Sequence, residues 1–347
     1  MPLWTRVFPC RETAADRKEE NGYMAENTTK KTSRISAAAA AGADQLTPDK
    51  FKVVGFTQEE ANKIDRPTIS YWQDAWRRLR KNPVAMAALV VLGLLVIMVI
   101  IGPHIRGYDY INMNVVDKNQ GPSGQYWFGT DSLGRDLFSR VWVGARASVI
   151  IALVATALKM IIGTLYGAAM AHFGGWVDDI MMRIIEVINS LPNLLITILI
   201  MMILGNNLFA LLVALSITAW CNTARQTRGL IKQLKESEYV YAAEVLGASP
   251  MRIILKHYVP NMISILLLDA STAIPNFIFT EAGLSFLGIG LTSPEISLGV
   301  LIAQGQQTLD FYPTQLLFPC VILCVIVMAF NLLGDGLRDA LDPKLRK

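Results

Sequence analysis

Long apolar runs separated by short polar segments occupy the chain from residue 84 onward. A transmembrane helix needs about 20 mainly apolar residues, and six runs approach this length with few charged side chains. Only Gly205 and Asn206 separate the third run from the fourth, which fits a tight turn. The pattern predicts an all-α integral membrane protein with six transmembrane helices. The runs are residues 84–101, 147–171, 181–204, 207–224, 261–280 and 312–334.

Polar segments divide the rest of the chain. Residues 1–67 form a polar tail that we expect to be partly disordered, and Met24 opens a segment that would serve equally well as a chain start. Residues 68–83 mix aromatic and basic side chains, as an amphipathic helix at a lipid surface does. The remaining expected parts are a first transmembrane helix at 84–103, an extracytoplasmic loop at 104–146, a core of five transmembrane helices at 147–337 containing a loop at 225–260, and a tail at 338–347.

The distribution of lysine and arginine predicts the orientation in the membrane, because basic loops resist translocation. The first 82 residues contain 15 of these cations, the segment 221–260 contains six and the end of the chain contains four. The segments on the other side contain five, all of them between residues 106 and 146. We therefore expect both termini and the loop at 225–260 to be cytoplasmic.

Composition and motifs narrow the class of function. Charged residues make up 17% of the chain, compared with about 25% in soluble domains, which argues against an ordinary soluble enzyme. The net charge of +4 is too small to indicate a nucleic-acid partner. The sequence contains no phosphate-binding G-x-x-x-x-G-K-[ST] loop, no HExxH and no GxSxG, so we expect no catalysis by this chain. Its three histidines are too widely spaced to predict a metal site.

The loop between the fourth and fifth runs has the pattern of a helical hairpin. Residues 236–246 favour a helix, Gly247 suits the left-handed position that ends one, and Ser249 followed by Pro250 is typical of a new helix start. Ala242 and Ala243 give the first helix a surface without bulk, which would fit into a partner's groove. The loop therefore predicts a rigid helix that projects from the membrane and can transmit motion.

This loop resembles the EAA loop of binding-protein-dependent ABC import permeases, in which it forms the coupling helix that contacts an ATPase. Tyr241 stands where the family often has Glu, and Val259 where it often has Leu. The resemblance implies a role in ATPase coupling for Tyr241, Ala242, Ala243, Glu244, Gly247, Ala248 and Pro260.

Three further segments are similar to the peptide and nickel branch of these permeases. They are WFGTDSLGRDLFSRVWVGARAS at 127–148, TEAGLSFLGIG at 280–290 and FNLLGDGLRDALDPKLRK at 330–347. The resemblance extends from about residue 70 to the end of the chain and is strongest to the C-type subunit of oligopeptide permeases. It implies the type I ABC importer permease fold, in a bacterial cytoplasmic membrane.

The resemblance also implies a set of partners. They are a homologous B-type permease, two ABC ATPase subunits that bind ATP and Mg, and an extracytoplasmic peptide-binding protein, while this chain binds no cofactor. Oligopeptides are then the expected cargo, with import of dipeptides or nickel as the alternative. Two other classes remain open, namely a carrier or channel that works without ATPases, and a scaffold or peptide-sensing receptor that transports nothing.

Two charged residues fall within predicted spans, where charges are costly and indicate function. Lys159 and Asp269 differ in depth by about 6 Å at 1.5 Å per helical residue, a gap that a lysine side chain can bridge. We expect them to pair or to share a hydrated cavity, unless each faces water or a subunit interface separately. Arg183 and Glu186 are three residues apart and predict a local pair at the start of the third span.

Other polar residues form two further groups of candidate functional residues, one in the external loop and one on the later spans. Asp131, Arg135 and Asp136 fit an ordered external loop in which side chains cap backbone groups, and contact with the binding protein is the alternative. Small and polar residues on the later spans are candidates for the substrate pathway, although periodicity does not separate lumen from helix contact. These candidates are Asn222, Ser271, Thr272 and Asn276.

Overall fold

The computed structural model describes residues 71–105, 107, 110–292 and 294–341. The predicted polar tail, Met24 and residues 342–347 lie outside this description. Every regular element in the described ranges is helical, and the only strand-like pairing there is an isolated bridge between Thr130 and Asp136. The prediction of an all-α protein is therefore confirmed.

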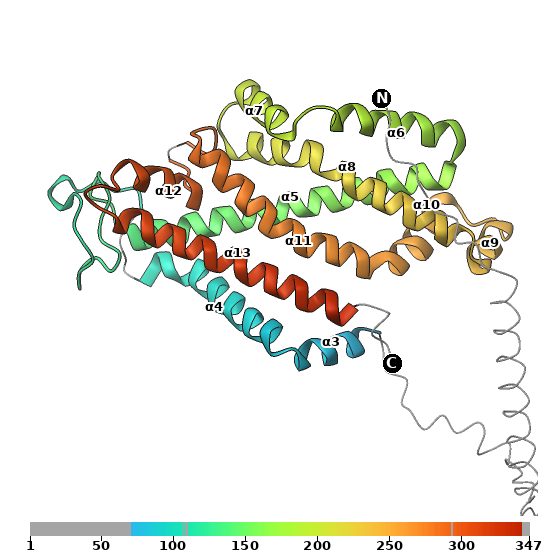
Figure 1. Cartoon of the computed structure of the whole chain (residues 1–347), viewed down its shortest axis with the longest axis horizontal. Coiled ribbons are helices and arrows are strands. Elements are labelled where there is room, and N and C mark those ends of the chain that lie inside the picture. The colour runs from blue at the N-terminus through green and yellow to red at the C-terminus, as the bar shows by residue number, and fades with distance from the viewer. Residues whose placement is uncertain (1–70, 106, 108–109, 293, 342–347) are drawn as a thin grey trace, which may run out of the picture. The chain divides into compact units, whose positions relative to one another are not determined.

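Five long helices lie side by side in a bundle (Figure 1). They are α4 (Pro83–Ile105), α5 (Leu137–Phe173), α8 (Leu208–Lys235), α11 (Val259–Phe286) and α13 (Thr314–Leu341). Helix α5 runs through the centre, where it packs along α8 and also contacts α4, α11 and α13. The α12 end carries α12 (Leu298–Gln307), η2 (Val115–Asp117) and the loop around them, and the α9 end carries α3 (Tyr71–Lys81), α9 (Glu238–Val245) and α10 (Pro250–Ile253).

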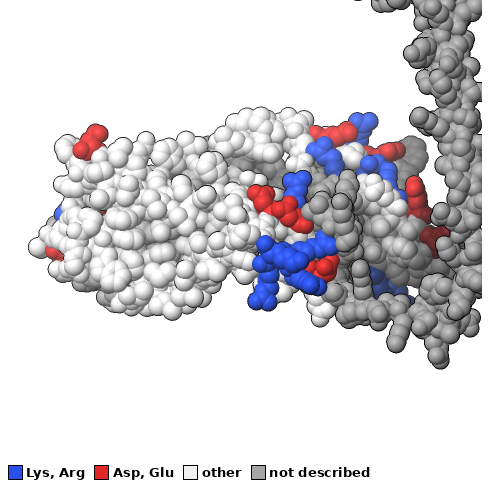
Figure 2. Space-filling view, turned by 60° about the horizontal axis from the view of Figure 1, so that its bottom comes forward, with Lys and Arg blue, Asp and Glu red and all other residues white. Residues whose placement is uncertain are grey.

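Length and composition qualify five helical segments of the described chain as membrane spans: α4, α5, α8, α13 and the continuous segment Pro250–Phe286. Figure 2 shows a broad band without charged side chains across the face in view, with lysines, arginines and carboxylates gathered toward the α9 end. A band of this kind matches a hydrocarbon layer, in which exposed charges are costly.

The third predicted span differs from a single straight helix. The structure divides it into α6 (Gly175–Asn189) and α7 (Asn193–Leu204), which are bent by 82° relative to each other. The break lies at Pro192, whose ring excludes a helical hydrogen bond and restricts the residue before it. The prediction of one continuous helix at 181–204 is therefore wrong, and the pair makes a sixth span only as a broken one.

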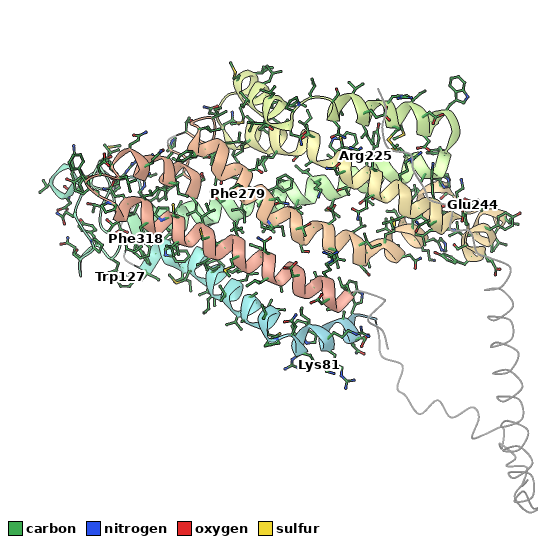
Figure 3. The ribbon with its side chains drawn as sticks, viewed as in Figure 1. Lys81, Trp127, Arg225, Glu244, Phe279 and Phe318 are labelled. Carbon is green, nitrogen blue, oxygen red and sulfur yellow. The ribbon has the colours of Figure 1, made fainter. Side chains whose placement is uncertain are left out.

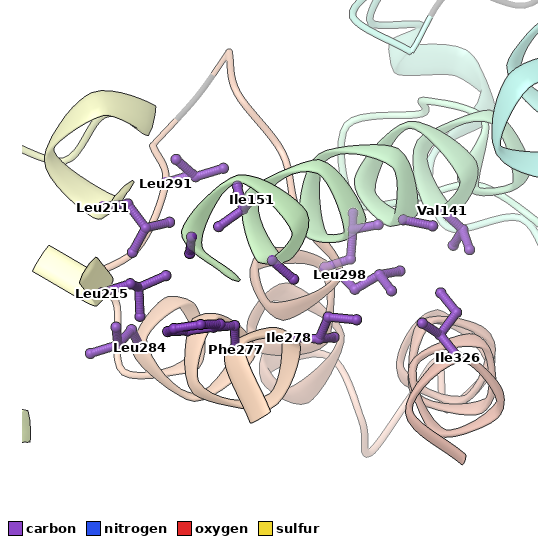
Figure 4. Packing of buried hydrophobic residues seen from close by; sticks show 14 of the residues in the cluster. Val141, Ile151, Leu211, Leu215, Phe277, Ile278, Leu284, Leu291, Leu298 and Ile326 are labelled. Carbon is purple, nitrogen blue, oxygen red and sulfur yellow. The ribbon is translucent and has the colours of Figure 1, made fainter. Parts of the chain in front are cut away.

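Close contact between backbones holds the centre of the bundle together. A Cβ atom on Gly167 of α5 would lie 2.2 Å from the carbonyl oxygen of Ala224 in α8. Apolar side chains fill the rest of the interior, as Figure 4 shows for Ile151 of α5, Leu211 of α8 and Phe277 of α11. The helices that carry the polar residues below are thus fixed against one another by packing.

Three predicted boundaries move because helices continue beyond their apolar runs. Helix α5 begins at Leu137, so the end of the predicted loop at 104–146 is helical, and the Asp136 carboxylate caps its first turn by accepting from the Ser139 backbone N–H at 2.8 Å. Helix α8 extends to Lys235, into the predicted loop at 225–260. Helix α13 likewise extends to Leu341, into the predicted tail at 338–347.

Within the amphipathic segment predicted at 68–83, Tyr71–Lys81 form α3, which packs against the end of α13. Ala75 and Leu79 are buried, while Trp72 and Trp76 are each about half exposed. Aromatic side chains beside a spanning helix are typical of the membrane interface. Helix α3 therefore has the form expected of an interfacial helix that leads into α4.

Candidate functional site

The hairpin at the α9 end is built by backbone hydrogen bonds that the sequence anticipates. Gly247 has φ +78° and follows the end of α9. Its N–H donates to the Glu244 carbonyl at 2.9 Å, and the Ala248 N–H donates to the Ala243 carbonyl at 3.0 Å. These two bonds form a Schellman motif, in which the left-handed residue is usually glycine. The predicted turn is present, and Pro250 opens α10 as expected.

Buried side chains seat this hairpin on the membrane helices. Val240 of α9 and Ile253 of α10 are almost completely buried, in a cluster with Tyr258 and Met262. The same cluster includes Ala168 of α5 and other residues of α5, α8 and α11. The hairpin is therefore anchored by its inner face rather than attached by a flexible loop.

Several large apolar side chains of the hairpin are exposed on its outer face. Leu246 is 86% exposed and Tyr241 is 68% exposed. Both are close in sequence to Glu244, which Figure 3 labels at the α9 end of the bundle. Exposed apolar patches of this kind mark interaction surfaces. We call this surface the α9 knob, and its residues are Tyr241, Val245, Leu246 and Met251.

A π-helix joins the hairpin to α11. The segment η3 (Ile254–Tyr258) contains the wide-turn bond from the Val259 N–H to the Ile254 carbonyl. Pro260 follows directly and has no N–H for a regular helical bond. The Asn261 side-chain amide donates to the His257 carbonyl at 2.6 Å and to the Tyr239 hydroxyl at 3.1 Å. Asn261 therefore links α9 directly to the first turn of α11.

A second polar cluster ties α6 to α8 at the same end. The buried carboxylate of Asp178 accepts hydrogen bonds from both Arg228 and Lys232 of α8. One turn further along α8, the Lys235 ammonium donates to the His172 carbonyl at the end of α5, at 3.0 Å. These contacts fix the helix ends on which the hairpin rests.

The two mid-span charges meet in the interior. The Lys159 ammonium of α5 lies 2.8 Å from Asp269 Oδ1 of α11, and the Thr223 hydroxyl of α8 donates to Asp269 Oδ2 at 2.7 Å. The side chains of the two charged residues are only 10% and 19% exposed. The predicted pair is thus present, and together with Thr223 it connects three spanning helices. The predicted local pair of Arg183 and Glu186 is also present, at 2.6 Å on the surface of α6.

The four pathway candidates fall into two groups. Ser271 is partly buried, and a Cβ on Gly334 of α13 would lie 3.3 Å from its hydroxyl, so it lies at a helix contact. Asn222, Thr272 and Asn276 are exposed instead. Four polar residues of α11 are spaced three or four positions apart and therefore share one helical face. We call this face the α11 polar stripe, and its residues are Asp269, Thr272, Asn276 and Thr280.

At the α12 end, the residues predicted for an external loop form hydrogen bonds within that loop and to the helices beside it. Asp131 accepts from Arg135 Nε and from Arg140 Nη1, each at 2.7 Å. The other amino group of Arg140 donates to Gln304 of α12 at 3.1 Å. Asp131 Oδ1 also accepts from the backbone N–H groups of Leu133 and Arg135, each at 2.9 Å, which is the backbone capping that the sequence suggests.

Several residues of these clusters were not predicted as site residues. Thr223 is uncharged and lies in an apolar run, so only the fold brings it to Asp269. Asn261 lies at a predicted helix start, where its link to Tyr239 depends on the hairpin's packing. The Arg228 and Lys232 side chains had a usable signal, since residues four apart share a helix face.

Two family models match this chain, one on each side of residues 123–159. Residues 160–347 match the family described as binding-protein-dependent transport system inner membrane component. Residues 70–122 match the N-terminal TM domain of oligopeptide transport permease C. The first match covers more than half of the chain.

Curated relatives agree over a longer range. The oligopeptide transport system permease protein OppC of Bacillus subtilis is 44% identical, covering 87% of this chain and 99% of that protein. The dipeptide transport system permease protein DppC of the same organism is 43% identical over 86% of this chain and 94% of that protein. OppC of Escherichia coli is 40% identical over 82% and 95%, respectively.

Among solved structures, a chain of the inward-facing MetNI methionine ABC transporter matches with a TM-score of 0.46 and 19% identity, covering 58% of this chain and 97% of that one. The family and the relatives agree with the apolar helices of the described bundle. The chain therefore belongs to the family of binding-protein-dependent transport system inner membrane components, and it is a multi-pass protein of the bacterial membrane.

Proposed function

We propose that this chain is one of two translocation subunits of an ATP-driven importer that takes up oligopeptides delivered by an extracytoplasmic binding protein. The observation that carries the proposal is the α9 knob, an exposed apolar tip on a hairpin whose other face is buried against α5, α8 and α11. Because the hairpin is anchored on its inner side and exposes apolar side chains on its outer side, a partner protein could bind there and move the hairpin as a unit.

The knob would dock on an ABC ATPase in the cytoplasm. The lysine and arginine residues clustered at the α9 end support this orientation, because cytoplasmic segments carry an excess of these residues. Both termini would then be cytoplasmic, and the α12 end would face the binding protein. The chain's own partners in the membrane would be a homologous permease and the lipid around the uncharged band.

The contacts suggest how motion would reach the membrane. Binding of ATP would draw two ATPases together and shift the α9 knob with them. Asn261 would carry this shift from α9 to the start of α11, since its amide bonds both Tyr239 and the π-helix carbonyl of His257. The pair of Lys159 and Asp269 would make α11 move together with α5. The energy comes from the ATPases, and this chain hydrolyses nothing.

The α11 polar stripe would line one wall of the pathway. In a membrane helix, exposed polar side chains face a partner protein or water rather than lipid. Thr272 and Asn276 satisfy this condition, because they are exposed in the single chain and would face the second permease across a shared pore.

Reconstitution tests the proposed function. Proteoliposomes containing this chain, the second permease, both ATPases and the binding protein should accumulate a labelled oligopeptide only when ATP is supplied. This chain reconstituted alone should accumulate none. Uptake by the chain alone would instead indicate a carrier or channel, and peptide binding without accumulation would indicate a receptor.

Dipeptides are the second candidate cargo, because DppC and OppC of Bacillus subtilis match this chain at 43% and 44% identity. Competition in the same vesicles separates the two. If oligopeptides are the cargo, excess unlabelled pentapeptide should block uptake of a labelled pentapeptide, whereas excess dipeptide should leave most of that uptake. Stronger inhibition by the dipeptide than by the pentapeptide would identify dipeptides as the cargo.

The pathway assignment predicts a labelling pattern. In a background without Cys10, Cys221, Cys320 and Cys324, Thr272→Cys and Asn276→Cys should react with a water-soluble maleimide in the reconstituted complex. Thiol reagents of this kind react with the thiolate, which needs water around it. Val90→Cys is the matched control, because Val90 is 58% exposed on the apolar face of α4 and should stay unlabelled. Equal labelling at all three positions would rule out the α11 polar stripe as the pathway wall.

A further inference from the structure

A carboxyl group that the transport mechanism does not use is enclosed at the α12 end. Glu281 lies on α11, five residues before the helix ends at Phe286, and it is 0% exposed. The Ser148 hydroxyl of α5 lies 2.8 Å from one of its carboxyl oxygens, and the Ser285 hydroxyl lies 2.8 Å from the other. Glu281 is therefore held by hydroxyl groups from two spanning helices.

The same hydroxyl groups reach the start of α12. Ser148 Oγ accepts from the Leu298 backbone N–H at 3.3 Å, and Ser297, which caps α12, lies 3.4 Å from Ser285 Oγ. The cluster consequently fastens α5, α11 and α12 to one another at a single point. We call it the Glu281 clasp, and its residues are Glu281, Ser148, Ser285 and Ser297.

Glycines pack the surroundings of the clasp tightly. A Cβ on Gly290 would lie 2.0 Å from Ser285 Oγ, and a Cβ on Gly299 would lie 2.6 Å from Ala282 Cα. A Cβ on Gly144 would lie 3.0 Å from the Ser297 carbonyl carbon. Three elements thus approach one another at backbone distance around a fully enclosed carboxyl group.

The groups around Glu281 indicate whether its carboxyl group is charged or neutral. None of the salt bridges formed by the described residues involves Glu281. Burying a carboxylate without a cation is strongly unfavourable, because the ion loses its hydration and gains no opposite charge in return. A neutral carboxyl group, by contrast, can donate its O–H to one serine and accept from another, since a hydroxyl does both.

We propose that Glu281 is protonated and acts as a positioning residue, which holds α12 against α5 and α11 through neutral hydrogen bonds. Helix α12 in turn holds Arg140 through Gln304, and Arg140 bonds Asp131 in the neighbouring loop. The clasp therefore sets the position of the surface that, on the proposed function, faces the binding protein.

Infrared spectroscopy of the purified permease complex in lipid nanodiscs tests the protonation. The unmodified complex should show a protonated carboxyl C=O band that Glu281→Gln removes. Glu295→Gln is the matched control, because Glu295 is exposed in the segment before α12 and its substitution should leave the band in place. A band that survives in Glu281→Gln, or a spectrum without one, would overturn the proposal.

Transport by the same variants tests the positioning role. Glu281→Gln should keep uptake within about twofold, since the amide donates and accepts as a neutral acid does. Glu281→Ala should lower uptake at least about fivefold, because it leaves two buried serine hydroxyls without their partner. A Gln variant as defective as the Ala variant would contradict the neutral clasp. The infrared measurement needs no peptide, so it tests the protonation of Glu281 independently of transport. If the unmodified complex transported no oligopeptide, that result would reject the proposed function but not the protonation of Glu281.

Discussion

Replacing Lys159 by alanine should destabilise the permease severely. Asp269 would keep its charge in the interior without a cation, and breaking a buried ion pair on one side costs about 3 to 5 kcal/mol. The two side chains are 10% and 19% exposed, so solvent screens them little. Thermal unfolding of the purified chain in mild detergent should show the midpoint lowered by roughly 6 °C or more. Asp269→Ala should have a similar effect, because it leaves the ammonium group unpaired.

Removing both charges should restore most of that stability. In a variant carrying Lys159→Met and Asp269→Leu neither member of this pair is charged, and similar replacements of buried pairs are often neutral or stabilising. The matched control is Arg183→Ala, which breaks a pair whose side chains are 81% and 49% exposed. It should change the midpoint little, since surface pairs contribute about 0 to 1 kcal/mol. Losses that add strictly in the double variant would show that the two residues act separately.

Features with a local cause were predictable from the sequence. The hairpin turn depends on Gly247 and Pro250, whose backbone preferences act within a few residues. The contact between Lys159 and Asp269 has no local cause, since the two residues are 110 apart. Their similar depth in otherwise uncharged spans suggested a pair or a shared cavity, but it left separate exposure to water or to a subunit interface open.

Other features that depend on contacts between distant parts of the chain were not predicted from the sequence. Hydropathy predicted residues 181–204 as one span, since an average over a window ignores the bend at Pro192. Glu281 fell just beyond the predicted fifth span, and only the extension of α11 to Phe286 shows that it is buried in the bundle. Ser271 and Thr272 are adjacent and similar in polarity, yet one contacts α13 and the other is exposed.

Placing a charge on the α9 knob should remove the ATPases from the complex. Leu246→Glu would bury a carboxylate in an apolar interface, and residues at the centre of an interface often contribute about 2 kcal/mol or more. Recovery of the ATPases with the affinity-purified permease should fall at least about tenfold, which corresponds to about 1.4 kcal/mol. Tyr241→Glu should act in the same direction.

The permease itself should tolerate these changes. Leu246 is 86% exposed, so its replacement disturbs few contacts within the chain, and the unfolding midpoint should stay the same. Phe311→Glu is the matched control, because Phe311 is 82% exposed at the α12 end. It should leave ATPase recovery unchanged. Equal recovery from Leu246→Glu and Phe311→Glu would show that the ATPases dock elsewhere.

Cross-linking from the tip of the hairpin tests the central claim most directly. A photoreactive amino acid placed at position 246 in the intact complex should give a covalent adduct between this chain and an ATPase subunit, and the same group at position 311 should give none. An adduct with the ATPase from position 311, or none from position 246 in a complex that retains its ATPases, would contradict a coupling role for the α9 knob.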